Sequence, residues 1–242
     1  TVIHCQEDVL LARVVADIQS ERPDICWVEY RTPPHAPSSQ GSVVEFSDTD
    51  PFNVAVLGAH NMQNLAAARA SCVAMGLEAD EFDRHIQSFT GAARRLEIAV
   101  DDPEHEFVAF RDFAHAPSKL RATQASIVGQ YPKRQVTAVF ELHTFSSLNK
   151  LFIPQYKDAM NAVDYAVVYF DPNVVAHKRL PELDEAFVKE AFGRSSLEVI
   201  TSPRELEARL NAVPRENHVL LMMSSGRFGG VEITLAPRQV PS

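Results

Sequence analysis

Hydrophobic residues in the second part of the chain follow two alternating patterns. From residue 96 onwards, short apolar runs typical of buried strands alternate with segments that have hydrophobic residues at helical spacing. Strands are expected at 96–100, 106–110, 136–142, 164–170, 197–200 and 218–223, and helices are expected to begin near Pro117, Asn149, Asp184 and Ser202. Strands that alternate with helices form βαβ units, so the pattern predicts an α/β domain with a mainly parallel sheet.

The first part of the chain shows the same patterns less regularly. They predict strands at 1–5, 25–30, 42–46 and 52–58 and helices at 7–22, 61–75 and 80–89. The segment 32–41 contains Pro33, Pro34 and Pro37 and is predicted to be a loop. The change in pattern divides the chain near residues 92–95 into two parts of different organisation.

The composition argues against several classes of protein. The 242 residues are 45% hydrophobic and 23% charged, as in ordinary globular proteins, and the formal net charge of −9 argues against a nucleic-acid partner or an anionic membrane surface. No apolar run reaches the length of about 18 residues that a transmembrane helix needs. The cysteines Cys5, Cys26 and Cys72 are isolated and odd in number, which predicts reduced thiols and a cytoplasmic protein.

Several common catalytic motifs are absent from the sequence. It contains no GxxxxGK[ST] phosphate loop, no GxGxxG, no HExxH, no GxSxG and no paired Cys/His spacing. We therefore do not expect a self-contained nucleotide hydrolase or kinase, and we predict no metal site from the residues of this chain.

A first candidate site lies where a strand passes into a helix at residues 57–70. Gly58 makes the turn, and His60, Asn61 and Asn64 follow at the helix N-terminus, where free N–H groups and the helix dipole favour phosphate or another polar ligand. Asn61 and Asn64 share one face, and their amides can recognise a base or a ribose. The alternative is that Asn61 caps the helix and Asn64 is an ordinary polar residue of its first turn.

Two further candidates lie near the first strands of the second part. Arg94 and Arg95 stand where a helix gives way to a strand, a position that suits contact with phosphate, although the pattern by itself favours two solvated surface arginines. Asp112 and His115 follow a strand, at the end where open α/β sheets bind ligands. Asp112 could accept from a ribose hydroxyl and His115 could position a phosphate; the alternative is a turn aspartate and a surface histidine.

Polar side chains also gather in two loops that follow strands, at 141–150 and 224–230. The candidate binding residues of these loops are His143, Ser146, Ser147, Asn149, Ser224 and Ser225. A polar loop by itself is usually only solvated, but both loops are expected at the same rim of the sheet as Asp112. Their joint placement predicts a cleft at that rim.

Taken in order, five segments resemble the Mur ligases, the ATP-dependent amide-forming enzymes of bacterial cell-wall synthesis. The segments are LGAHNMQNLAAA, FTGAARRLEI, DFAHAPSKLRAT, ELHTFSSLNK and LLMMSSGRFGG, beginning at residues 57, 89, 112, 141 and 220. The resemblance implies a parent protein with domains for UDP-sugar binding, ATP hydrolysis and acceptor binding. It assigns residues 1–93 to the end of the central, P-loop-type α/β domain and residues 94–242 to a complete, Rossmann-like acceptor domain.

The resemblance also implies roles for the candidate residues. Those expected to bind ATP are His60, Asn61, Asn64, Arg95 and Asp112. Arg95 would reach the phosphates with His115 beside them, which makes these two the expected catalytic residues, while Asp112 would hold the ribose. The residues of the two later loops would line the incoming amino acid or peptide. ATP and Mg²⁺ are the implied cofactors, with the main magnesium ligands expected upstream of Thr1.

The resemblance leaves the acceptor open. The loop at 112–123 is most similar to that of murein peptide ligases, which join UDP-N-acetylmuramate to the tripeptide L-alanyl-γ-D-glutamyl-meso-diaminopimelate through an acyl phosphate. L-alanine ligases of the family have a His-His pair where this chain has His115-Ala116, and L-alanine is the alternative acceptor. Because the phosphate loop would lie upstream, the chain alone is expected to be inactive. A free-standing, non-catalytic binding module derived from the acceptor domain is the alternative from another class.

Overall fold

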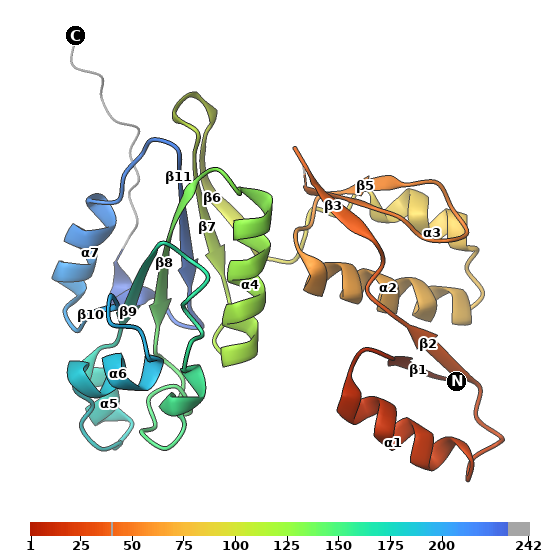
Figure 1. Cartoon of the computed structure of the whole chain (residues 1–242), viewed down its shortest axis with the longest axis horizontal. Helices are drawn as coiled ribbons and strands as arrows, with labels where there is room; N and C mark the ends of the chain where they lie inside the picture. Colours follow the sequence, from red (N-terminus) through yellow and green to blue (C-terminus); the bar gives the residue numbers. More distant parts are fainter. Residues whose placement is uncertain (40, 232–242) are drawn as a thin grey trace. The chain divides into compact units, whose positions relative to one another are not determined.

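The computed structural model describes residues 1–39 and 41–231. The chain divides into two compact units, which we call the N-terminal unit (Thr1–Gly91) and the C-terminal unit (Ala92–Ser242). Figure 1 shows the course of the chain through both units. No helix among the described residues is long and apolar enough to cross a membrane.

The C-terminal unit is built on a six-stranded sheet with the order β10-β9-β8-β11-β7-β6. Its strands are β6 (Glu97–Asp102), β7 (Phe107–Asp112), β8 (Gln135–Glu141), β9 (Tyr165–Tyr169), β10 (Glu198–Ile200) and β11 (His218–Met223). Every neighbouring pair is parallel except β6 with β7. The predicted α/β fold with a mainly parallel sheet is confirmed.

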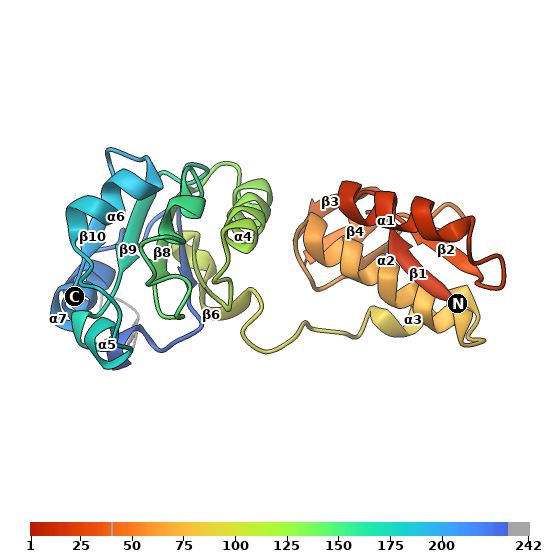
Figure 2. The ribbon, with the colours of Figure 1, turned by 90° about the horizontal axis from the view of Figure 1, so that it is seen from below.

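Helices cover both faces of this sheet, which explains why the inner strands β8, β9 and β11 are nearly continuous apolar runs. The helices are α4 (Pro117–Gln130), α5 (Pro172–His177), α6 (Glu185–Phe192) and α7 (Pro203–Asn211). Leu206 and Leu210 of α7 pack against Tyr169 and Leu220 on one face. On the opposite face, Phe140 contacts the ring of Phe192. Figure 2 shows the strands between α4 and α7.

Proline and aspartate residues define where these helices begin. Proline occupies the first turn of α4, α5 and α7, where a missing N–H has no cost. Asp184 caps α6 by accepting from the Phe187 N–H at 2.8 Å, and Asp171 caps α5 by accepting from the Asn173 N–H at 2.8 Å.

The N-terminal unit contains two small sheets and three helices. Its elements are β1 (Val2–Cys5), α1 (Val9–Gln19), β2 (Trp27–Tyr30), β3 (His35–Ser38), β4 (Gly41–Val44), β5 (Phe52–Val54), α2 (Ala59–Ala74) and α3 (Ala79–Ile86). β1 and β2 pair in parallel, whereas β3, β4 and β5 form an antiparallel sheet. Val44, Phe52, Met62 and Phe82 share its apolar core.

Two sequence predictions of secondary structure are wrong. The segment 32–41 is not all loop, because β3 lies within it; β3 is an edge strand, where proline need not donate to a neighbour. No α-helix begins near Asn149. The chain instead forms turns and a short 3₁₀ helix at Ile153–Tyr156, because side chains such as Asn149, which accepts from the Leu151 N–H, compete with helical hydrogen bonds. The short helix α5 was not predicted.

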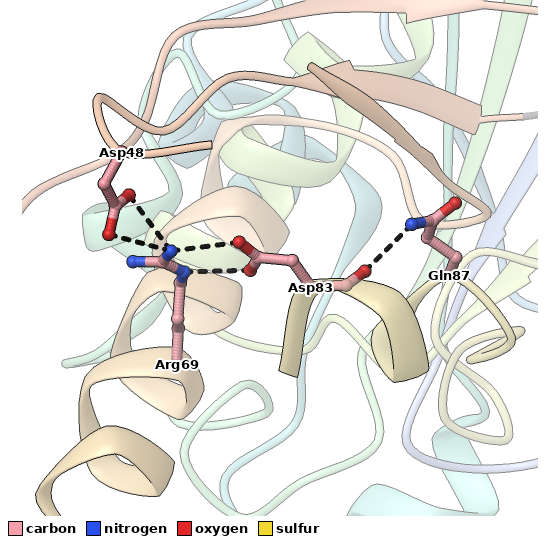
Figure 3. A network of polar contacts seen from close by, with 4 residues as sticks. All are labelled: Asp48, Arg69, Asp83 and Gln87. Atoms are coloured by element: carbon pink, nitrogen blue, oxygen red, sulfur yellow. Dashed lines mark hydrogen bonds and ion pairs between the residues drawn. The ribbon is translucent and has the colours of Figure 1, made fainter. Parts of the chain in front are cut away.

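Arg69 joins three segments of the N-terminal unit (Figure 3). Its guanidinium on α2 donates two hydrogen bonds, of 2.8 and 2.9 Å, to Asp83 on α3, whose carboxylate is almost fully buried. It also donates to exposed Asp48 at 3.0 Å and lies 4.4 Å from the ring centre of Phe46. The backbone carbonyl of Asp83 accepts from Gln87 at 3.0 Å. Arg69 therefore connects α2 and α3 to the β4–β5 connection.

We predict that Asp83→Asn lowers the free energy of unfolding of the N-terminal unit by on the order of 3 kcal/mol, because it leaves the Arg69 charge without its buried partner. Asp48→Asn, which changes a half-exposed partner of the same arginine, should cost less than about 1 kcal/mol. Urea unfolding followed by the fluorescence of Trp27, the single tryptophan, reports on this unit. Equal losses in the two variants would contradict the prediction.

A second prediction concerns acid stability of the C-terminal unit. His218 is fully buried, with Nε2 2.8 Å from the Thr137 hydroxyl, and burial lowers the pKa of His218. The unfolded chain therefore binds a proton that the folded chain resists, so stability should fall as the pH drops below about 6.5. Unfolding followed by circular dichroism should show a smaller fall in His218→Gln, while the exposed control His85→Gln should behave as wild type.

Candidate functional site

The carboxyl ends of four parallel strands form one rim of the C-terminal sheet. Met223 at the end of β11 is in register with Asp112 of β7 and Phe140 of β8, and Glu141 is in register with Tyr169 of β9. The loops after these strands therefore start side by side. The predicted placement of three polar loops at the same rim is confirmed.

Asp112 has a buried carboxylate that binds three donors of the protein. Oδ1 accepts from the Ala114 N–H at 2.7 Å and from the Thr123 hydroxyl at 3.2 Å, and Oδ2 accepts from the Leu96 N–H at 2.9 Å. Charge-assisted bonds of this kind are roughly twice as strong as neutral ones. Asp112 thus fixes the entry to β6, the loop after β7 and α4, and a ribose would have to compete with these donors.

One ring nitrogen of His115, Nδ1, is engaged in a hydrogen bond with the backbone. Nδ1 lies 3.0 Å from the Phe113 carbonyl, and because a carbonyl only accepts, Nδ1 carries the proton. Nε2 is then the nitrogen left for a ligand, as an acceptor in the neutral imidazole and as a donor in the imidazolium. The Tyr156 hydroxyl donates to the His115 carbonyl at 2.5 Å, which anchors the backbone of this loop from the 3₁₀ helix.

Arg94 and Arg95 lie in a backbone segment of unusual conformation. Arg94 and Leu96 have φ angles of 57° and 47°, a region that costs energy for residues other than glycine. The Phe113 N–H donates to the Arg94 carbonyl at 2.8 Å, which holds the segment against the rim. The Arg95 guanidinium lies 5.4 Å from the Phe113 ring centre and is exposed.

Glu141 also lies at this rim, although it was not among the site residues predicted from the sequence. Its side chain is 4% exposed, and Oε2 accepts from the Ser224 hydroxyl and from the Phe228 N–H at 2.8 Å. Oε1 lies 3.6 Å from Nδ1 of His143. The signal in the sequence was a glutamate at the end of an otherwise apolar strand, because a buried charge there needs partners from elsewhere in the chain.

Two open cavities lie beside these residues. One, of about 330 Å³, is lined by Arg94, Glu141, His143, Asp171, Ser225 and Arg227 among others. The other, of about 690 Å³, is lined by Arg94, Arg111, Asp112, Ser224 and Arg227 among others. Both cavities therefore bring positive and negative side chains together, as a zwitterionic ligand requires.

Tyr169 closes the inner side of the rim. Its side chain is fully buried, and its hydroxyl has no hydrogen-bond partner among the described residues. Burial raises the pKa of Tyr169 to about 12, with the negative charges of Asp171 and Glu141 adding to the effect. The phenol thus stays protonated at neutral pH. Gly229, with a φ angle of 65°, leaves no room for a Cβ beside this hydroxyl.

The predicted acceptor-binding residues divide into two groups. His143 and Ser225 line the smaller cavity, and Ser224 lines the larger one, although its hydroxyl is already bonded to Glu141. The other three, Ser146, Ser147 and Asn149, line neither cavity. Ser147 is buried and bonded to Thr144, Asn149 accepts from the Leu151 N–H, and Ser146 is exposed.

The candidates of the N-terminal unit lie in the first turns of α2. Gly58 is the N-cap residue, with a φ angle of 82°. The Asn61 amide donates to the Leu57 carbonyl at 2.9 Å, so this amide ties the helix to the β5–α2 connection rather than capping the helix through its own side chain. Asn64 is exposed and His60 is partly exposed.

Within residues 1–39 and 41–231, no three His, Cys, Asp or Glu side chains are placed to hold a metal ion together.

No family model matches the chain. Curated relatives are nonetheless similar over most of it. The UDP-N-acetylmuramate–L-alanine ligase of Halorhodospira halophila is 30% identical over 183 residues, which cover 74% of this chain and 37% of that protein. The enzyme of the same name from Nitrosospira multiformis is 30% identical over 194 residues, which cover 74% of this chain and 38% of that protein. The chain thus spans well under half the length of these relatives.

Solved structures show the same fold. The UDP-N-acetylmuramate–alanine ligase of Thermotoga maritima matches with a TM-score of 0.64 and 18% identity, over 84% of this chain and 45% of that one. A murein peptide ligase of Psychrobacter arcticus matches with a TM-score of 0.59 and 18% identity, over 94% and 48%. A folylpolyglutamate synthase of Mycobacterium tuberculosis matches with a TM-score of 0.63 and 17% identity, over 92% and 52%. The sequence relatives place the chain in the Mur ligase family, and the solved structures show that it has the same fold.

Proposed function

We propose that this chain is part of an ATP-dependent amide ligase of peptidoglycan synthesis or recycling. In this proposal residues 1–93 are the end of the central ATPase domain and residues 94–242 are the acceptor-binding domain. ATP and UDP-N-acetylmuramate would bind largely to additional polypeptide. The share of 37% and 38% of the relatives' length that the chain spans supports this division of labour.

The observation that carries the proposal is the mixed charge of the smaller rim cavity. Arg94 and Arg227 can bind the carboxylate of an amino acid or peptide, while Glu141 and Asp171 favour its ammonium group. His143 lines the same cavity and can change its role between donor and acceptor. An acceptor held in this way would be oriented before the reaction, which lowers its entropic cost.

The proposed reaction has two steps. The muramyl carboxylate takes the γ-phosphoryl group of ATP and ADP leaves, with Mg²⁺ supplying charge neutralisation. The acceptor amine then attacks the acyl phosphate, the new C–N bond forms, and inorganic phosphate leaves while the amine gives up a proton. For this chain we propose that the Arg95 guanidinium and the Nε2–H of His115 in its imidazolium form donate to the phosphoryl oxygens, and that the rim cavity aligns the amine.

The exposed apolar surface of α1 fits a surface that packs against polypeptide outside the N-terminal unit. Leu10 and Val14 are 73% and 52% exposed, and Ile18 is 40% exposed, at a spacing that puts all three on one stripe of the helix. Monomeric proteins rarely leave such stripes uncovered. A free-standing binding module, the alternative from another class, would have to tolerate this stripe in water.

Two different observations favour two different acceptors. The loop that follows Asp112 resembles that of peptide ligases, which favours the tripeptide. The two curated relatives named above are L-alanine ligases by name, which favours L-alanine. The proposed site accommodates either ammonium group, so the choice is a matter for experiment.

We predict that the purified chain makes no amide product from ATP, UDP-N-acetylmuramate and either acceptor, because no phosphate loop is present in its sequence. Product analysis by mass spectrometry is the measurement, and the complete L-alanine ligase of Halorhodospira halophila serves as positive control. ATP-dependent product from the chain alone would refute this part of the proposal.

We predict that a chimera regains ligase activity when this chain replaces the matching C-terminal segment of the Halorhodospira halophila enzyme. Phosphate release, measured separately with L-alanine and with the tripeptide, identifies the acceptor from the larger kcat/KM. The same chimera with Arg227→Ala, which removes one arginine of the rim cavity, should raise the KM for the acceptor by about tenfold or more. A folded chimera that is inactive with both acceptors favours the binding module.

A further inference from the structure

Glu141 occupies a position where a carboxylate is costly. It is the last residue of β8, it is 4% exposed, and it lies beside the buried ring of Tyr169 in the neighbouring strand. A buried charge persists only when hydrogen bonds compensate its desolvation. The contacts of Glu141 therefore indicate what its negative charge does.

One carboxylate oxygen organises the loop after β11. Oε2 accepts from the Ser224 hydroxyl and from the Phe228 N–H, while the Ser224 oxygen accepts from the Gly226 N–H at 2.6 Å. Residues 224–228 are thus folded around Oε2. Since an N–H can only donate, the Phe228 contact requires an acceptor at this position.

The other oxygen is directed at the histidine of the smaller cavity. Oε1 lies 3.6 Å from Nδ1 of His143, within ion-pair range and slightly longer than a hydrogen bond. Gly226 packs against this pair so closely that a Cβ there would lie 2.7 Å from His143 Cγ and 2.8 Å from Glu141 Oε2. The imidazole is therefore confined between Gly226 and the carboxylate.

We propose that Glu141 is a positioning residue that acts through His143. Its carboxylate keeps the proton of the neutral imidazole on Nδ1, which leaves Nε2 as a hydrogen-bond acceptor for the ammonium group of the acceptor substrate. The binding of the ammonium group by Nε2 rests on the proposed function, whereas the position of the proton on Nδ1 concerns the protein alone. Residues 224–228 and His143 are then set by the same carboxylate, one through each oxygen.

The matched variant is Glu141→Gln, because it retains an acceptor for the Phe228 N–H but places a donor opposite Nδ1 of His143. The amide oxygen must replace Oε2 to accept from the Phe228 N–H, so the amide NH₂ replaces Oε1 and faces His143. Nδ1 must then accept, and the imidazole proton moves to Nε2. A role that was only structural would leave the tautomer unchanged.

The experiment uses the chain with ¹⁵N-labelled histidine at about pH 8.5, where an ordinary imidazole is neutral. Long-range ¹H–¹⁵N correlation should show the Nδ1–H form of His143 in wild type and the Nε2–H form in Glu141→Gln. The signals of His105, whose Nδ1 lies 2.9 Å from Asp102, are the internal control and should not change. The same tautomer of His143 in both proteins overturns the proposal.

A second variant keeps the proposal testable if Glu141→Gln does not fold. Gly226→Ala retains the carboxylate but displaces the His143 ring, so the preference for the Nδ1–H form should be lost. An unchanged preference for this form would contradict the proposed role of Glu141. Titration with L-alanine and with the tripeptide adds a separate readout, in which Glu141→Gln should weaken binding about tenfold. Equal affinity in both proteins overturns the role in substrate binding. If wild type binds neither acceptor, the proposed function fails while the tautomer result still stands.

Discussion

The position of β11 between β7 and β8 sets the arrangement of the C-terminal unit. This strand follows β10 in the chain, yet it pairs in parallel with two strands that come more than 70 residues before it. All three strands end at the same level, so the loops that follow them share one rim. Without β11 in the centre, Asp112 and Glu141 would belong to strands with no common neighbour.

Two buried carboxylates give this rim its order. Asp112 accepts from the segment before β6 and from α4, and Glu141 accepts from the loop after β11. Each carboxylate is stable in the interior because the loops supply donors, and each loop is held because the carboxylate is there. The conformation of the rim loops therefore depends on hydrogen bonds to these two carboxylates and not on apolar packing alone. This distinguishes them from the sheet, which is held by burial on both faces.

The sequence predicted what depends on local pattern and missed what depends on distant partners. The six strands of the C-terminal sheet were predictable because each contains a short apolar run bounded by polar residues. β3 was not, since its proline, Pro37, suits an edge strand only when a partner such as β4 is present. Likewise Glu141 belongs to a predicted polar loop, but its bond to Ser224 spans 83 positions, and no local spacing reveals it. Among the predicted site residues, the structure brings His143 and Ser225 to the same cavity. The hydrogen bonds of buried Ser147 and of Asn149 depend on turns, where the sequence predicted a helix.

The fold by itself does not select an acceptor. Solved structures with the same architecture carry names as different as murein peptide ligase and folylpolyglutamate synthase, at identities of 17–18%. The sheet is common to them, so differences in substrate must come from side chains at its rim. In this chain those side chains include two arginines, two carboxylates and a histidine around a single small cavity. In the proposed function, a site of mixed charge would recognise a zwitterion through its ends, and the length of the acceptor would then be limited by what surrounds the cavity rather than by the charges within it.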